Sequence, residues 1–246
     1  MSSNVQNGPQ SPSTGYWSLL APYAVEPLTA SCAIVPAYRD LVAKSALQRG
    51  ESVQYMSARE WLKGGLKMAP TIGGIIGVQM CLQTVLEKAM TGESNEESLS
   101  SKFVSSAVIG TFSSPLLAAY NAQTIKMRAW EAFRNVSKKQ CLVISLQETA
   151  FVGGLSVAGK LAELMKKKFG NNKAVEYVAV FTAGALGSIA GHPANTALTR
   201  WQSGMKVETV TQSMWGVFKK ARAIGTFAVC YKLGKEILNP KVELLQ

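Results

Sequence analysis

The sequence predicts an all-α membrane protein with six transmembrane helices in three pseudo-symmetric repeats. Composition supports this class, because 47% of the 246 residues are hydrophobic and only 17% are charged, against roughly 25% charged residues in an average soluble domain. Long uncharged runs recur along the chain, and the loops between them differ in charge. Landmark residues also repeat at a near-constant spacing, which indicates repeated units within one domain.

Three uncharged runs are the best-supported spans, because each is close to the roughly 20 residues that cross a bilayer as a helix. They cover residues 68–86, 103–125 and 177–199. Buried helices of a soluble α protein are the alternative interpretation. Gly, Ala and Ser are frequent in these runs, and small residues suit close helix contacts within lipid, so we favour membrane spans.

The other three expected spans are weaker, and they cover residues 16–38, 141–159 and 223–231. The first two hold one carboxylate each, Glu26 and Glu148, which in a membrane would face a cavity or serve a function. The last run is short. It crosses the membrane only if Lys232 and Lys235 face a polar cavity or extend their amines to the membrane edge.

Charge separates the loops into two sets. The chain holds 26 Lys and Arg against 15 Asp and Glu, and the loops after the first, third and fifth spans, here called the odd loops, are basic. The loop after the second span is acidic, with Glu87, Glu93, Glu96 and Glu97, whereas the loop after the fourth span is basic again. Despite this imperfect alternation, the bias predicts that the odd loops share one side of a membrane and both termini the other.

The chain offers little material for enzyme chemistry. Its cysteines are far apart in apolar stretches, at Cys32, Cys81, Cys141 and Cys230, which argues against a zinc site or a disulfide framework. We expect them to be buried, reduced thiols. His192 is the single histidine, which leaves little for a metal site or a catalytic triad. We therefore expect no enzyme activity, no metal and no cofactor.

An internal repeat is visible when the third and fifth spans are overlaid. Gly110, Ser114 and Asn121 recur as Gly184, Ser188 and Asn195 at one constant spacing. Asp40 aligns with the two asparagines, and the even spans align through Gly73, Gly153 and Gly225. These landmarks predict repeats at about 16–90, 100–170 and 174–238, between a flexible N-terminal tail at 1–15 and a C-terminal tail at 239–246.

Residues 183–202 resemble the odd-helix signature of the mitochondrial carrier family. That signature is a proline followed by an acid, a base, a second base and a glutamine, and here Pro193, Asn195, Leu198, Arg200 and Gln202 stand at those positions. Trp61-Leu-Lys63-Gly64 and Lys67-Met-Ala-Pro70 are similar to the family's aromatic-x-base-Gly and base-x-x-Pro elements. The resemblance covers about residues 16–238.

The resemblance implies a six-helix bundle in a mitochondrial membrane, the inner rather than the outer, with a ring of ion pairs closing each end. The ring beside the odd loops departs from the family pattern. Its acid positions hold Asp40, Asn121 and Asn195, its base positions hold Ala43, Thr124 and Leu198, and the next basic positions hold Lys126 and Arg200. In the second ring Lys232 occupies an acid position. We therefore expect that neither end can close by ion pairs.

The resemblance also implies two binding regions. The family's substrate site carries over to Lys67, Gln147 and Lys219. Two lysines facing a cavity would suit an anion; alternatively, they mark the basic membrane boundary. The residues that match the family's cardiolipin contacts, where helix N-termini and lysines hold a phosphate, are Lys63, Gly64 and Gly216.

Two functions remain open on these residues. The first is a carrier-fold protein with weak or no transport, which serves as a structural or accessory subunit of a mitochondrial membrane complex and contacts lipids such as cardiolipin. The second is an active carrier that exchanges a small anion, a nucleotide or a carboxylate. The altered rings favour the structural function. We expect no nucleic-acid partner, because the aromatic residues lie inside the spans rather than among the basic loops.

Overall fold

The computed structural model describes residues 14–91, 99–170, 172–207 and 209–238, and every regular element in these ranges is a helix. The expected all-α class is confirmed for this part of the chain. The long helices are α1 (Thr14–Gln48), α2 (Ala58–Thr91), α3 (Leu99–Thr124), α5 (Lys138–Phe169), α6 (Lys173–Ala190) and α9 (Val217–Leu238). The short ones are α4 (Ala129–Arg134), α7 (His192–Gln202) and α8 (Val210–Ser213).

Three expected segments fall at the edges of these ranges. The C-terminal tail at 239–246 and the acidic residues Glu93, Glu96 and Glu97 lie outside the described residues. The same holds for the N-terminal tail up to residue 13. Residues 14 and 15, expected in that tail, instead form the start of α1.

Local signals set several helix ends. At the start of α5, Ser137 and Gln140 form a capping box, in which each backbone N–H donates to the other residue's side-chain oxygen. Asn172 caps α6 by accepting the Val175 N–H over 2.8 Å. Helix α6 ends at Gly191, and Pro193 stands in the first turn of α7, where its missing N–H is harmless.

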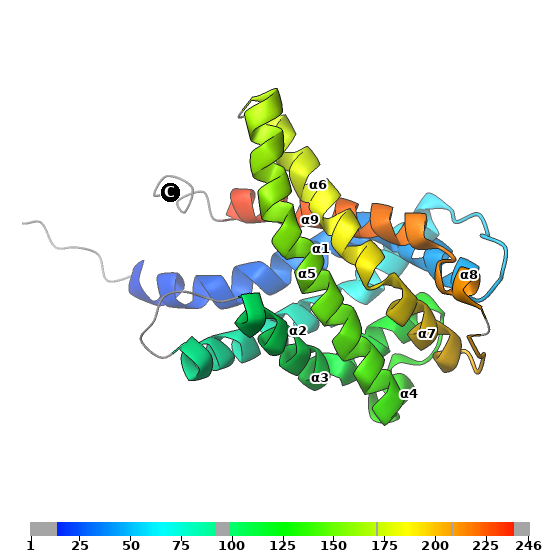
Figure 1. Cartoon of the computed structure of the whole chain (residues 1–246). Helices are drawn as coiled ribbons and strands as arrows, with labels where there is room; N and C mark the ends of the chain where they lie inside the picture. Colours follow the sequence, from blue (N-terminus) through cyan, green and yellow to red (C-terminus); the bar gives the residue numbers. More distant parts are fainter. Residues whose placement is uncertain (1–13, 92–98, 171, 208, 239–246) are drawn as a thin grey trace, which may run out of the picture.

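The long helices form a closed ring. Each packs against the next along the chain, α1 on α2, α2 on α3, α3 on α5, α5 on α6 and α6 on α9, and α9 returns to pack on α1. Figure 1 shows the α5–α6 pair diverging from α1 and α2 with distance from the short helices α4, α7 and α8. The ring therefore narrows toward the end that carries the short helices.

Close contacts in the ring depend on small residues. The buried core includes Ile34 and Leu41 of α1, Met68 and Ile75 of α2, Ile144 of α5, and alanines such as Ala30, Ala118 and Ala223. Gly64 of α2 leaves space for Tyr38 of α1, because a Cβ at Gly64 would overlap the Tyr38 ring. Such close approach is typical of helices packed within lipid.

Three helical segments are long and apolar enough to cross a membrane: Ala58–Gln83 in α2, Phe103–Thr124 in α3 and Lys173–Ala190 in α6. They correspond to the three best-supported runs of the sequence. The weaker runs lie in α1, α5 and α9, where no segment of the described residues qualifies. A membrane protein is indicated, and length and composition support three spans among the described residues.

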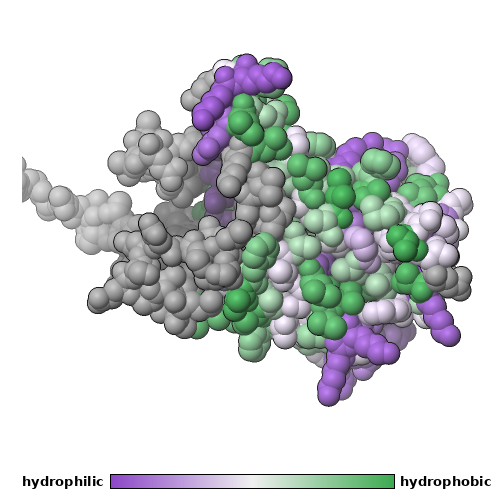
Figure 2. Space-filling model, in the orientation of Figure 1, coloured by the Kyte–Doolittle hydropathy of each residue, from purple (hydrophilic) through white to green (hydrophobic). Residues whose placement is uncertain are grey.

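The outer surface agrees with contact to lipid. Large apolar side chains are exposed on three helices, among them Phe112, Leu142, Leu146, Val178 and Leu186. Figure 2 shows apolar residues across the middle of one face and hydrophilic residues gathered toward its edges. Contiguous apolar surface on a folded chain marks an interaction with a membrane or another protein.

The cysteines are free thiols, but the expectation that all are buried was wrong. Cys32 and Cys81 lie on exposed helix faces, and Cys141 and Cys230 are partly exposed. An apolar run predicts burial in protein only when the run does not face lipid. Among the described residues, no group of His, Cys, Asp and Glu could hold a metal ion.

Candidate functional site

The C-terminal ends of α1, α3 and α7 meet in a buried polar cluster, which we call the odd-helix junction. It consists of Lys44, Ser45, Gln48, Asn121, Thr124, Asn195, Thr196, Thr199 and Arg200. The apolar face of α1 continues into it, because Lys44 and Gln48 follow the buried Ala37 and Leu41 at helical spacing. The three odd loops consequently start from the same end of the ring.

Two asparagines and a lysine form the centre of the junction. Asn195 Nδ2 donates to Asn121 Oδ1 over 3.5 Å, and Lys44 Nζ donates to Asn195 Oδ1 over 2.8 Å. Asn121 Nδ2 in turn donates to Gln202 Oε1 over 2.7 Å. Burial holds the pKa of Lys44 well below its ordinary value, and the charges of Lys220 and Arg49 lower it further.

Two arginines connect the helix ends through backbone carbonyls. Arg200 Nη1 donates to the Gln48 carbonyl at the end of α1 over 3.1 Å, and Arg49 Nη1 donates to the Ile125 carbonyl beyond α3 over 3.3 Å. Carbonyls at a helix C-terminus lack intrahelical partners and carry partial negative charge, so a guanidinium stabilises them. Arg200 belongs to a signature whose charged residues form ion pairs in the family that it resembles. Here its guanidinium donates to backbone carbonyls instead.

Asp40 has a different partner from the asparagines. Its carboxylate pairs with Arg222 of α9, whereas Lys44, one helical turn later, contacts Asn195. Among the described residues, Asp40 therefore makes no hydrogen bond to Asn121 or Asn195, the residues with which it aligns. The sequence signal for Lys44 was its place on the helix face that continues from Leu41, and the signature alignment obscured it.

Ion pairs do join helices at the other end of the ring, which corrects the expectation that neither end can use them. Lys232 of α9 lies 2.8 Å from Glu176 of α6 and 2.8 Å from Glu236 of its own helix. Lys235 pairs with Glu26 of α1. The carboxylates across from α9 come from α1 and α6 rather than from the expected acid positions, so the family pattern gave no signal for them.

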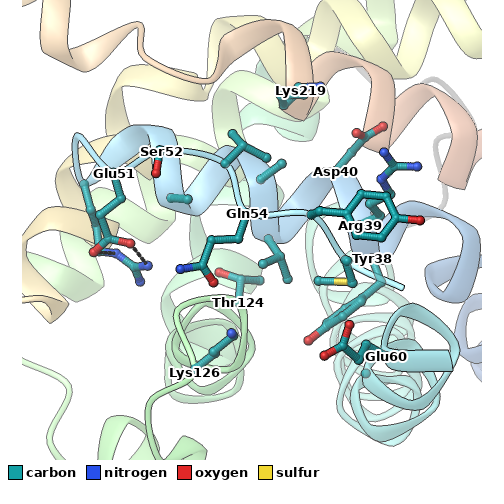
Figure 3. Close-up of a pocket in the computed structure, with 18 of the residues that line it drawn as sticks. Tyr38, Arg39, Asp40, Glu51, Ser52, Gln54, Glu60, Thr124, Lys126 and Lys219 are labelled. Carbon is teal, nitrogen blue, oxygen red and sulfur yellow. Dashed lines mark hydrogen bonds and ion pairs between the residues drawn. The ribbon is translucent and has the colours of Figure 1, made fainter. Parts of the chain in front are cut away.

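A pocket of about 790 Å³ opens beside the junction, and we call it the loop pocket. It lies between α1, the loop at 49–57, the start of α2 and the end of α3. Figure 3 shows Lys126 and Lys219 on different sides of it, with the loop that carries Glu51 and Gln54 running between them. The cations that line it without a hydrogen bond or ion pair to any described residue are Arg39, Lys63, Lys67, Lys126 and Lys219.

The carboxylates around the loop pocket have partners of their own. Arg49 Nε donates to Glu51 Oε1 over 2.8 Å, and this hydrogen bond lowers the pKa of the Glu51 carboxyl. Glu60 accepts a hydrogen bond from the Ser57 hydroxyl over 2.7 Å. Asp40 lines the pocket and pairs with Arg222, which does not line it. The five cations form no ion pair with these carboxylates, although the charge of Lys126 also acts on the carboxylates of Glu51, whose pKa it helps to lower, and of Glu60. Basic side chains still outnumber acidic ones in the lining, and their field favours an anionic group such as a phosphate or a carboxylate.

The structure brings two of the three expected substrate residues together. Lys67 and Lys219 line the loop pocket. Gln147 lies elsewhere, against Gly191 at the end of α6, where a Cβ on the glycine would come within 2.9 Å of the Gln147 carbonyl. The separation arises because Gln147 is on α5, which contributes no residue to the pocket.

Of the three residues expected to contact lipid, two line the loop pocket and one does not. Lys63 and Gly64 line the loop pocket together with Lys67. Gly216 lies at the start of α9 with a positive φ of 80°, and its α-carbon packs on the Lys44 backbone. Residues expected in separate substrate and lipid sites thus share one pocket.

Lys126 and Pro193 mark helix boundaries. Lys126 follows α3 with a positive φ of 59°, a conformation in which a helix commonly ends, and its side chain lines the loop pocket. Pro193 opens α7 directly after the break at Gly191. Both residues therefore shape the junction through the backbone.

Comparison with known proteins identified no relative of this chain. No family model matches the chain, and no curated protein and no solved structure matches it. Function is therefore inferred from the junction, the pocket and the ring.

Proposed function

We propose that the chain is a multi-pass membrane protein of the mitochondrial carrier type, which serves as a structural or accessory subunit and exchanges little or no solute. The closed ring of long helices supports the carrier architecture. In this proposal α1 with α2, α3 with α5, and α6 with α9 form three repeats of two spans each. The resemblance of residues 183–202 to the family's signature is the second support.

The odd-helix junction is the observation that favours a static role. A transporter alternates between arrangements with different interactions, so the ends of α1, α3 and α7 would have to separate. Separation would leave the amides of Asn121 and Asn195, the Lys44 ammonium and helix-end carbonyls without partners. Each buried group that loses its partner costs about 1–3 kcal/mol. Several such groups would open together, so one conformation is favoured.

The loop pocket supports a contact with anionic lipid. Its unpaired lysines would hold the phosphates of a head group such as that of cardiolipin. Tyr55, which lines the pocket, and Trp130 of α4 are both exposed, and these residue types favour the membrane interface. In this proposal the odd loops lie at an anionic surface of the mitochondrial inner membrane, and the outer faces of the ring contact lipid or other subunits.

Uptake by liposomes tests the structural role. Purified protein reconstituted with cardiolipin is expected to take up no more labelled nucleotide, phosphate or dicarboxylate than protein-free vesicles do. Circular dichroism of the same vesicles verifies that the protein is helical, so that absence of uptake is not caused by unfolding. Saturable uptake of any of these solutes would contradict the proposal.

An active anion carrier is the second candidate, because Lys67 and Lys219 line one pocket and are unpaired. If uptake is measured, Lys67→Ala and Lys219→Ala should each abolish it under this alternative. Arg59→Ala is the matched control, since Arg59 is an exposed base near the same loop that does not line the pocket. Uptake lost in the two lysine variants and kept in the control would establish the carrier function.

A further inference from the structure

Residues 52–56, which we call the strap, cross the loop pocket between two fixed ends. All five of them line the pocket. At one end, the Glu51 N–H donates to the Ala46 carbonyl of α1 over 2.9 Å. At the other end, Glu60 Oε2 in the first turn of α2 accepts a hydrogen bond from the Ser57 N–H over 2.9 Å. The two ends of the strap are therefore anchored to α1 and α2.

Between these ends the strap has no partner in the part of the chain that the structure describes. It holds no regular secondary structure. Neither its backbone groups nor the side chains of Ser52, Gln54 and Tyr55 form a hydrogen bond with any described residue, and Tyr55 is 87% exposed. A segment with exposed backbone and few buried contacts moves at little cost in free energy. The strap can therefore change position while α1 and α2 stay folded.

The strap adds neutral hydrogen-bond donors to a pocket that already holds five unpaired cations. Figure 3 shows it running between Lys219 and Lys126, with the Gln54 side chain extending toward Lys126. Ammonium groups and backbone N–H groups both form strong hydrogen bonds with an oxyanion. A phosphate ester offers three oxygens to such donors, whereas a carboxylate offers two. The combination of cations with the strap's N–H groups therefore favours a phosphate.

We propose that the strap is a lid, which closes over a phosphate group bound to the cations of the loop pocket. The phosphate accepts hydrogen bonds from the strap's N–H groups and from the Gln54 amide, so the strap moves toward the lysines and becomes less exposed. This inference rests on the anionic contact proposed above for the same pocket, and it adds the segment that opens and closes that pocket. A lipid head group and a soluble phosphate ester share this chemistry, so the test includes both.

Cleavage by chymotrypsin after Tyr55 reports whether the strap is open. The purified full chain in detergent is digested with inorganic phosphate, glycerol 3-phosphate or cardiolipin, and with acetate at equal ionic strength. At about ten times its dissociation constant, an effective probe should slow this cleavage about tenfold, because only the open form is cut. Cleavage after Trp130, which is exposed and does not line the pocket, should not change. If no phosphate probe protects Tyr55, or acetate protects it equally, the proposal is overturned.

Unfolding midpoints of the same samples separate the lid from the lipid contact, because a raised midpoint reports binding and protection of Tyr55 reports closure. A midpoint raised by cardiolipin without protection would overturn the lid and leave the lipid contact standing. No change in either readout with any probe would contradict both. Protection by cardiolipin alone would support a lid over a lipid head group, and protection by inorganic phosphate as well would support a lid over the phosphate itself.

Matched variants test the donors of the closed form. Lys126→Met removes a cation and should require about tenfold more probe for equal protection, and Gln54→Leu, which removes a neutral donor, about fivefold more. Lys139→Met is the control and should keep the wild-type protection, because Lys139 is an exposed base that does not line the pocket. Wild-type protection in both test variants would overturn the proposal. If Lys126→Met does not fold, Gln54→Leu and the probes on the wild-type protein still decide.

Discussion

The two ends of the helix ring are held by different chemistry. At the odd-helix junction, buried amides, hydroxyls and Lys44 bond to one another and to helix-end carbonyls. At the other end, Lys232 and Lys235 of α9 pair with partly exposed carboxylates of α6 and α1. Water and salt compete with an exposed ion pair, which contributes about 0–1 kcal/mol, whereas separating buried hydrogen-bonding groups costs more. The ring therefore resists opening at the junction more than at the ion-paired end.

The largest expected effect comes from breaking the junction at Asn195. Asn195→Leu removes the acceptor of the Lys44 ammonium and leaves a buried charge unpaired, which should reduce the free energy of unfolding by about 3 kcal/mol. Chemical denaturation in detergent followed by circular dichroism measures it. The double variant Asn195→Leu with Lys44→Met should recover part of the loss, and a single variant as stable as wild type would show that the junction does not hold this end.

The junction should also make stability depend on pH through Lys44, which lies beyond the expected first span. Its native pKa is lowered by burial, so between that value and the usual lysine value of about 10.4 the unfolded chain binds more protons than the native one. Wild-type stability should therefore rise as the pH increases toward about 10. Lys44→Met should show a smaller rise. Unfolding midpoints at pH 7 to 10 check it, and equal slopes in both proteins would refute the prediction.

At the ion-paired end the expected effect is smaller. Lys235→Met removes the pair with Glu26, and because Lys235 is 46% exposed, the loss should be about 0.5 kcal/mol. One molar salt should remove the difference between variant and wild type, since screening weakens exposed pairs. A loss as large as that of Asn195→Leu would erase the contrast between the two ends.

The smallest effect is expected on the surface of α4. Arg128 and Glu131 form an ion pair in which both side chains are largely exposed, at 83% and 56%. Arg128→Ala should leave the unfolding midpoint unchanged within error. A measurable shift would indicate that α4 also helps to hold the junction end of the ring.

Helices and apolar runs could be predicted because they depend on local patterns. The three uncharged runs overlap the candidate spans in α2, α3 and α6, and Asn121 and Asn195, which the repeat aligns, are hydrogen-bonded to each other. The contacts of Asp40 could not be predicted in this way. Asp40 and Lys44 are one turn apart and project along nearly the same side of α1, so only the packing of α7 and α9 decides which of them contacts Asn195.

The loop pocket shows a second limit of sequence reasoning. Lys63 and Lys67 are one turn apart on α2, and their shared exposure could be predicted from helical spacing. Their proximity to Lys126 and Lys219 depends on the path of residues 49–57, which holds no helix before Ala58.

The break between α6 and α7 fixes which side of this helix pair can meet lipid. Helix ends leave backbone N–H and C=O groups without intrahelical partners, and hydrocarbon offers no water to replace those partners. Gly191, at the break, packs on the Gln147 backbone of α5, while Val178 and Leu186 are exposed. In a bilayer the pair would therefore have one permitted rotation about its own axis, with the interrupted backbone turned toward protein and the leucine and valine toward acyl chains.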